Sequence, residues 1–229
     1  MTPLAVVAWG LICIGATVCR ADDKPADASA ASSSPSPSPS STSQVDDPNG
    51  SDGRHWAILV YRGLMTNNSL WQVIGARNVV FKYGDVSAVD ILHELAHENP
   101  FRKFFQPLVG TIYLGGNVSM HQDSLGGGLE LAPYLMWRWR HLPFERLVVS
   151  TIGVGEGVSY VTSVPLRERA LGAGGKQLLD FMAVETTIGP PSHREIEFVL
   201  RIQHRSPAFG LFGTSVSSNA LGLGARYFF

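Results

Sequence analysis

The stretch R-E-I-E-F-V-L-R-I-Q-H-R-S, residues 194–206, decides the fold because the polarity of its side chains alternates. Successive side chains of a β-strand point to opposite faces. One face would be apolar and would turn polar only at its end; it holds Ile196, Phe198, Leu200, Ile202, His204 and Ser206. The other face would carry the charges; it holds Glu195, Glu197, Val199, Arg201, Gln203 and Arg205. A strand that divides an apolar surface from a polar one is typical of a transmembrane β-barrel.

Three more segments repeat this alternation. The chain closes with N-A-L-G-L-G-A-R-Y-F-F, residues 219–229, which ends on an aromatic residue. In residues 107–121, the two faces separate Leu108, Ile112, Leu114, Val118 and Met120 from Thr111, Tyr113, Asn117, Ser119 and His121. In residues 127–140, they separate Leu129, Leu131, Pro133, Leu135, Trp137 and Trp139 from Glu130, Tyr134, Arg138 and Arg140. We expect the charged side chains of both this segment and 194–206 to pack inside a barrel.

The length from residue 55 to residue 229 suits eight strands of about ten residues each. The sequence places them near 56–66, 87–98, 107–121, 127–140, 146–161, 177–188, 194–206 and 218–229. The second of these contains H-E-L-A-H and would equally suit a helix. The connections at 141–145 and 189–193 are short, whereas those at 67–86, 162–176 and 207–217 are longer. This asymmetry is typical of the two sides of an outer-membrane barrel.

The fold class expected is therefore all-β, an eight-stranded antiparallel transmembrane β-barrel of the cell outer membrane. The alternative is a soluble lipocalin-like barrel, which also has eight strands but places apolar residues inside. Alternation alone does not distinguish the two. The terminal aromatic residue, the many glycines and the tryptophans near a strand end favour the membrane.

The N-terminal region divides into two segments before the barrel at 55–229. Residues 4–18 form an apolar run that is too short for a membrane helix, and residues 1–21 are expected to be a signal peptide. Residues 22–54 are rich in Ser, Pro, Asp and Ala and predict a disordered linker. Both cysteines lie in the leader, so the mature chain would have no thiol chemistry. A net charge of −1 gives no indication of nucleic-acid binding.

The pair His204 and Ser206 is the candidate site for chemistry. The lumen of an eight-stranded barrel is filled by side chains, so a reaction would take place on the outer surface or in the loops. A serine two residues from a histidine on one strand face is placed for base-assisted attack on a lipid ester. The alternative is that both residues belong to a polar girdle that meets lipid headgroups.

Several segments in this part of the chain carry a resemblance to a known family. They are G-E-G-V-S-Y at 155–160, Q-L-L-D-F at 177–181, and R-I-Q-H-R-S followed by P-A-F-G-L-F-G at 201–213, and then the closing strand. In this order they resemble the lipid A 3-O-deacylases, also called acyloxyacyl hydrolases. The family fold is an eight-stranded outer-membrane barrel with a Ser-His-Glu triad on its outer surface.

The resemblance implies that Ser206 is the nucleophile and His204 the general base. The family's acid position holds Asn219 here, and an amide can orient a histidine but cannot stabilise an imidazolium as a carboxylate does. Pro207 is a second departure, because it removes a backbone N–H that an oxyanion hole could use.

The function expected is that of an outer-membrane serine esterase that removes an ester-linked acyl chain from lipid A, the lipid part of lipopolysaccharide. The alternative is a non-catalytic barrel with a structural or lipid-binding role. No cofactor, metal or nucleotide is implied. His93 and His97 match the zinc-protease spacing H-E-x-x-H, but on a strand they would lie about 13 Å apart.

Overall fold

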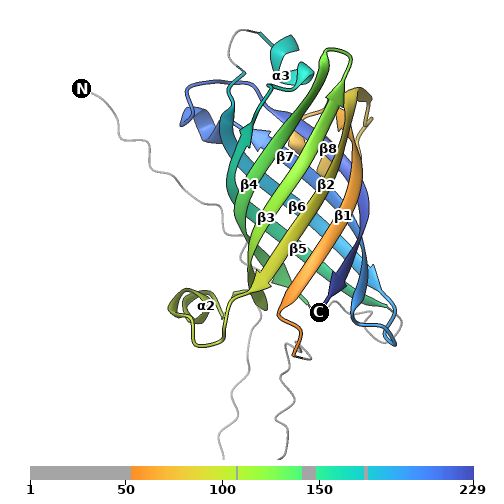
Figure 1. Ribbon diagram of the computed structural model, residues 1–229, viewed down its shortest axis with the longest axis vertical. Helices are drawn as coiled ribbons and strands as arrows, with labels where there is room; N and C mark the ends of the chain where they lie inside the picture. The colour runs from red at the N-terminus through yellow and green to blue at the C-terminus, as the bar shows by residue number, and fades with distance from the viewer. Residues whose placement is uncertain (1–52, 107, 141–147, 173–174) are drawn as a thin grey trace, which may run out of the picture. The chain divides into compact units, whose positions relative to one another are not determined.

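The computed structural model describes residues 53–106, 108–140, 148–172 and 175–229. The expected signal peptide, all but the end of the expected linker and the 141–145 connection lie outside the described residues. Eight antiparallel strands close into a barrel in chain order, and β1 pairs with β8 (Figure 1). The strands are β1 (Trp56–Thr66), β2 (Phe81–Glu94), β3 (Thr111–Asp123), β4 (Gly126–Trp139), β5 (Val149–Val161), β6 (Leu178–Gly189), β7 (Ile196–Ser206) and β8 (Ser218–Phe228).

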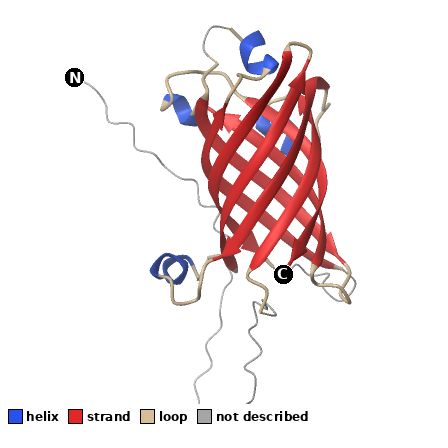
Figure 2. Ribbon diagram, viewed as in Figure 1, coloured by secondary structure: helices blue, strands red, loops and turns tan. Residues whose placement is uncertain are grey.

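Short helices lie in the connections between these strands (Figure 2). They are α1 (Leu70–Ile74), α2 (Pro100–Phe105), α3 (Leu166–Ala170) and the 3₁₀ turn η1 (Ala208–Gly210). Because the strands alternate in direction, the connections with α1, α3 and η1 meet at one end of the barrel. The connection with α2 lies at the other end, with the C-terminus (Figure 1).

The eight expected strands are confirmed, although the third begins at Thr111 rather than at residue 107, and the difference is larger in β2. This strand begins at Phe81, six residues before the expected start, and ends at Glu94. The helical alternative for its sequence is wrong. The segment after it, which was expected to extend the strand to residue 98, instead turns away and leads into α2, where Asn99 accepts hydrogen bonds from the first N–H groups of the helix.

The barrel has an apolar outside and a charged inside. Along β7, Phe198 and Leu200 are 59% and 41% exposed, whereas their neighbours Val199 and Arg201 are 1% and 0% exposed. A soluble barrel would show the opposite arrangement, because exposed apolar side chains in water are unfavourable. The inverted pattern identifies a transmembrane barrel of the outer-membrane type. Within the described residues, no helix is long and apolar enough to span a bilayer.

Ion pairs fill the middle of the lumen. The Glu185 carboxylate accepts hydrogen bonds from Arg201 at 2.7 Å and from Arg226 at 2.7 Å, and both arginines are fully buried. Arg201 also pairs with Asp90, and Arg138 pairs with Glu197 at 2.5 Å. Each of these buried charges therefore meets an opposite charge, which offsets the cost of taking it out of bulk water.

A second polar cluster lies nearer the end that carries α3. Glu130 is fully buried and contacts His121 at 2.5 Å, while Gln203 donates to it at 2.7 Å. The inward faces expected for 107–121 and 127–140 are thus confirmed for the residues that lie inside these strands. The prediction that Glu195 lies in the lumen is wrong. Glu195 lies in the turn before β7, where its Oε1 is 3.1 Å from His193 Nδ1. Hydrogen bonding to its own backbone N–H and to His193 lowers the pKa of Glu195.

Candidate functional site

The expected site residues lie at the end of the barrel that carries α1 and α3. His204 and Ser206 are near the end of β7, and Asn219 is the second residue of β8. His204 pairs with Asn219 across the two strands, and Ser206 pairs with Asp180 of β6 on the other side. By alternation with the exposed Leu200, both His204 and Ser206 take outward positions on β7.

A short hydrogen bond joins His204 to Asn219. The distance between His204 Nδ1 and Asn219 Oδ1 is 2.6 Å. The hydrogen bond from Asn219 Nδ2 to the Asn68 carbonyl, at 2.8 Å, fixes which end of the Asn219 amide carries the nitrogen. Its oxygen must therefore face the imidazole, so His204 carries a proton on Nδ1. In the neutral ring Nε2 is then unprotonated and can accept a proton.

Arg167 of α3 supports this arrangement from behind. Its guanidinium donates to the carbonyls of Asn68, Thr66 and Ser217 at 3.3, 2.8 and 3.1 Å. Burial of the guanidinium lowers the pKa of Arg167 below its ordinary value. The connection after β1 and the start of β8 are thereby held together, and Asn68 is fixed as the acceptor that orients Asn219.

The hydroxyl of Ser206 has a different partner from the one that the sequence suggests. Ser206 Oγ donates to Asp180 Oδ2 at 2.9 Å and accepts from the backbone N–H of Ala208 at 3.2 Å. In the described residues, the hydrogen bonds of Ser206 thus lead to Asp180 and Ala208, and those of the His204 ring to β8. The two residues share a strand face, but their side chains are not hydrogen-bonded to each other in this state.

His204 is also less accessible than its position on the strand predicts. The side chain was expected to face lipid, yet the residue is only 8% exposed. The reason is that the connection after β1 folds back over this part of the barrel, so that α1 packs against β7. Ser206, two residues further on, remains half-buried and reachable.

Two carboxyl groups on β6 and β5 were missed by the sequence analysis, namely Asp180 beside Ser206 and Glu156 beside Asp180. Asp180 is 8% exposed, and Glu156 of β5 lies within hydrogen-bonding reach of it. Both occupy outward positions, since Leu178 and Val158 on the same faces are exposed. The alternation of residues 177–188 places Asp180 as a single acid on an otherwise uncharged outward face, and this pattern could have identified it from the sequence.

The H-E-L-A-H segment forms no metal site. Glu94 pairs with Arg102 at 2.7 Å, and His97 Nε2 lies 3.3 Å from the same guanidinium. His93 stacks on Trp56 instead, with ring centroids 4.2 Å apart. Across the part of the chain that the structure describes, no three His, Cys, Asp or Glu side chains gather in a way that could hold a metal ion.

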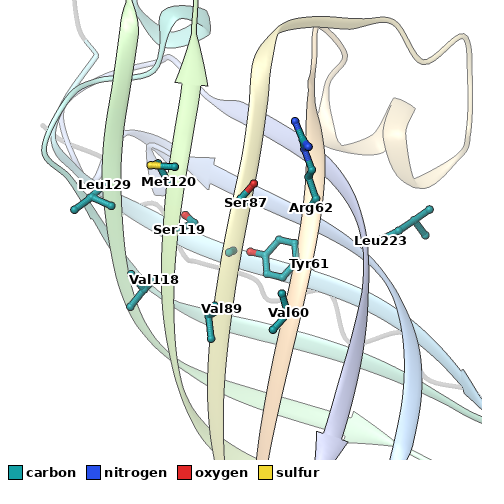
Figure 3. A pocket seen from close by; sticks show the side chains of 11 residues that line it. Val60, Tyr61, Arg62, Ser87, Val89, Val118, Ser119, Met120, Leu129 and Leu223 are labelled. Carbon is teal, nitrogen blue, oxygen red and sulfur yellow. The ribbon is translucent and has the colours of Figure 1, made fainter.

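A hollow of about 440 Å³ lies on the lipid-facing surface over β1 to β4 (Figure 3). Its outward walls are apolar side chains, among them Val60, Val89, Val118 and Leu223. Ser87 provides a small side chain between them, and Arg62 at one side pairs with Asp85 at 2.9 Å. The hollow suits hydrocarbon, and its lining contains no histidine that could act as a base for its serines.

No protein-family model and no curated protein sequence matches the chain. Among solved structures, the outer membrane enzyme PagL is 12% identical with a TM-score of 0.49, over 75% of this chain and 98% of that one. Neisserial surface protein A (NspA) is 9% identical with a TM-score of 0.44, over 76% and 96%. The N-terminal barrel domain of Pseudomonas aeruginosa OprF is 9% identical with a TM-score of 0.41, over 77% and 98%. At these identities and scores, the likenesses carry no argument about function.

Proposed function

We propose that this barrel is an outer-membrane esterase that removes an ester-linked acyl chain from lipid A, with Ser206 as nucleophile and His204 as general base. The observation that carries the proposal is the hydrogen bond between His204 Nδ1 and Asn219 Oδ1. It leaves Nε2 free to accept a proton on the strand face that also presents Ser206. The resemblance to the lipid A deacylases, which covers most of residues 105–229, supports the substrate class.

The reaction would proceed by acyl transfer to the serine. Rotation of the Ser206 side chain would bring its hydroxyl from Asp180 to His204 Nε2. Ser206 Oγ then attacks the ester carbonyl carbon while Nε2 takes its proton, and the same proton passes to the departing sugar alkoxide. Water attacks the acyl-serine in a second half-reaction, again with His204 as base, and releases the free fatty acid. Asn219 holds the imidazole orientation throughout.

The surroundings of Ser206 suit an amphipathic substrate. Phe209 and Leu211, in the connection just after the serine, are 107% and 82% exposed. Ala208 and Phe209 both have positive φ angles, of 44° and 57°, which is unusual for residues with a side chain. A turn held in this conformation beside a reactive group presents apolar side chains to the lipid, and such strain is common at functional sites.

The test is the structure of lipid A in cells with and without the protein, measured by mass spectrometry. We expect loss of one ester-linked acyl chain when the wild-type protein is present and no loss with Ser206→Ala or His204→Ala. The double variant should be no worse than either single variant, because both residues serve one step. Labelling of wild-type protein in detergent by a fluorophosphonate, lost in Ser206→Ala, would identify the nucleophile. Unchanged lipid A together with no labelling would refute the proposal.

The second candidate function is a non-catalytic barrel that binds lipid or serves as an envelope structural protein. It is favoured by one observation, namely that the Ser206 hydroxyl is bound to Asp180 rather than to His204. Under this candidate the polar cluster would only stabilise the end of the barrel. The wild-type protein would then leave lipid A intact, whereas the Ser206→Ala variant would fold with altered stability.

A further inference from the structure

We propose that Asp180, on the neighbouring strand β6, is the carboxylate of this site and supplies the negative charge that the neutral amide of Asn219 cannot supply. The inference rests on the proposed function, since it assigns a positioning residue to the same reaction. It begins from the hydrogen bond of 2.9 Å between Ser206 Oγ and Asp180 Oδ2. Asp180 would hold the serine before reaction and face the imidazolium of His204 during it.

The position of Asp180 follows from the register of the barrel. Asp180 pairs with Ser206, and Met182 pairs with His204, so the carboxylate lies one level from the histidine on the adjoining strand. His204 is therefore flanked by Asn219 on β8 and by Met182 on β6, two residues from Asp180. The hydrogen bond of Asp180 in this state is to the serine, two residues along β7 from His204.

The surroundings of Asp180 are difficult to explain by stability alone. Asp180 is 8% exposed on the outward face of β6, on which Leu178 and Ile188 are exposed. Its described neighbours are the hydroxyl of Ser206 and the carboxyl of Glu156. Two acids therefore lie side by side on an outward-facing surface. A leucine at this position would make the barrel more stable in lipid than a carboxylate does, so we infer that the charge serves the reaction.

Two residues, Asn219 and Asp180, would share the role that a single acid has in a Ser-His-acid triad. Asn219 sets the tautomer of His204 through Nδ1, while Asp180 contributes negative charge from the side of the serine. When Ser206 gives its proton to His204, the imidazolium lies between an amide oxygen and a carboxylate. Both groups favour the charged ring, but only Asp180 does so with a full charge.

The experiment compares Asp180→Asn, Asp180→Glu and wild type, purified and reconstituted in vesicles that contain lipid A. Asp180→Asn keeps the shape and an acceptor but removes the charge. We expect it to lower kcat about 10- to 100-fold with KM nearly unchanged, the range expected for the loss of a hydrogen bond to a charged group. Asp180→Glu, which keeps the charge, should recover part of that loss. A purely structural residue would not show rescue by charge.

The control is Asp85→Asn, which removes an equal charge from a carboxylate that pairs with Arg62 on β1. It should leave kcat unchanged. Folding of every variant is checked by the altered gel migration of the unheated barrel. A kcat that Asp180→Asn leaves intact, an equal loss in Asp85→Asn, or an Asp180→Glu variant as slow as Asp180→Asn would each overturn the inference while the proposed function stands. A folded wild type without activity would overturn both.

Discussion

Replacing Asn219 tests the geometry around His204 most directly. Asn219 is fully buried, and its two hydrogen bonds, at 2.6 and 2.8 Å, connect the imidazole to the Asn68 carbonyl. Asn219→Ala would leave the Nδ1–H of His204 buried without its side-chain acceptor, which costs about 1–3 kcal/mol. The Asn68 carbonyl would keep Arg167 as a donor at 3.3 Å, so it adds little to this cost.

If the loss falls on the transition state, kcat would drop by about 5- to 150-fold. Asn219→Asp is the matched variant, because it has the same shape, keeps an acceptor for His204 and adds a charge that favours the imidazolium. We expect it to keep or raise kcat, although it turns an oxygen toward the Asn68 carbonyl and loses about 1–3 kcal/mol of stability. Asn219→Glu adds the same charge but also a methylene for which the buried position has little room.

The assay follows release of fatty acid from lipid A in vesicles, and the pH dependence of kcat is recorded for each variant. Stability is followed in parallel by urea titration of the reconstituted barrel. Equal activity of wild type and Asn219→Ala would refute the role of Asn219 in orienting His204. A loss of activity in Asn219→Ala that matches its loss of folded protein would reduce the residue to a structural one.

Three other changes test the fold and the support of the site. Leu200→Arg should destabilise the inserted barrel by about 2–4 kcal/mol in urea titrations in vesicles, because this side chain meets hydrocarbon; an unaffected midpoint would mean that this face does not contact lipid. Glu185→Gln should cost about 3–5 kcal/mol in the same assay, since it leaves buried arginines without their carboxylate; a neutral effect would show that water reaches the lumen. Arg167→Met should lower kcat with the barrel still folded on gels, because Asn68 loses its support; full activity would separate α3 from the site.

The strands were predictable because each one repeats a simple contrast. On β7 the outward Phe198 and Leu200 alternate with the inward Val199 and Arg201, and only a closed barrel in lipid reconciles exposed apolar side chains with buried charges. The ends of the strands were less certain. The start of β2 escaped prediction because Lys82 and Gly84 interrupt the alternation there. Ile112 has an outward position but is fully buried. Alternation predicts the direction of a side chain and not whether another segment covers it.

The chemistry of the site was predictable only in part. His204, Ser206 and Asn219 were predicted as site residues from the sequence, and the structure brings His204 and Asn219 into contact. The partners Asn68 and Asp180 depend on distant segments, at sequence separations of 151 residues from Asn219 and 26 from Ser206. Such partners follow from the register between strands and from the folding of connections, which no local pattern specifies.

The position of the polar cluster is itself informative about function. The lumen is occupied by paired charges such as Glu185 with Arg226, so polar groups that are meant to meet a substrate have to lie outside. On the outside, polar residues are unfavourable unless they bond one another or water. Here each is matched by a partner on the next strand, His204 by Asn219 and Ser206 by Asp180. Apolar residues at these positions would stabilise the barrel in lipid more simply. Four interacting polar groups beside an exposed apolar turn are the arrangement that the proposed reaction at the membrane surface requires.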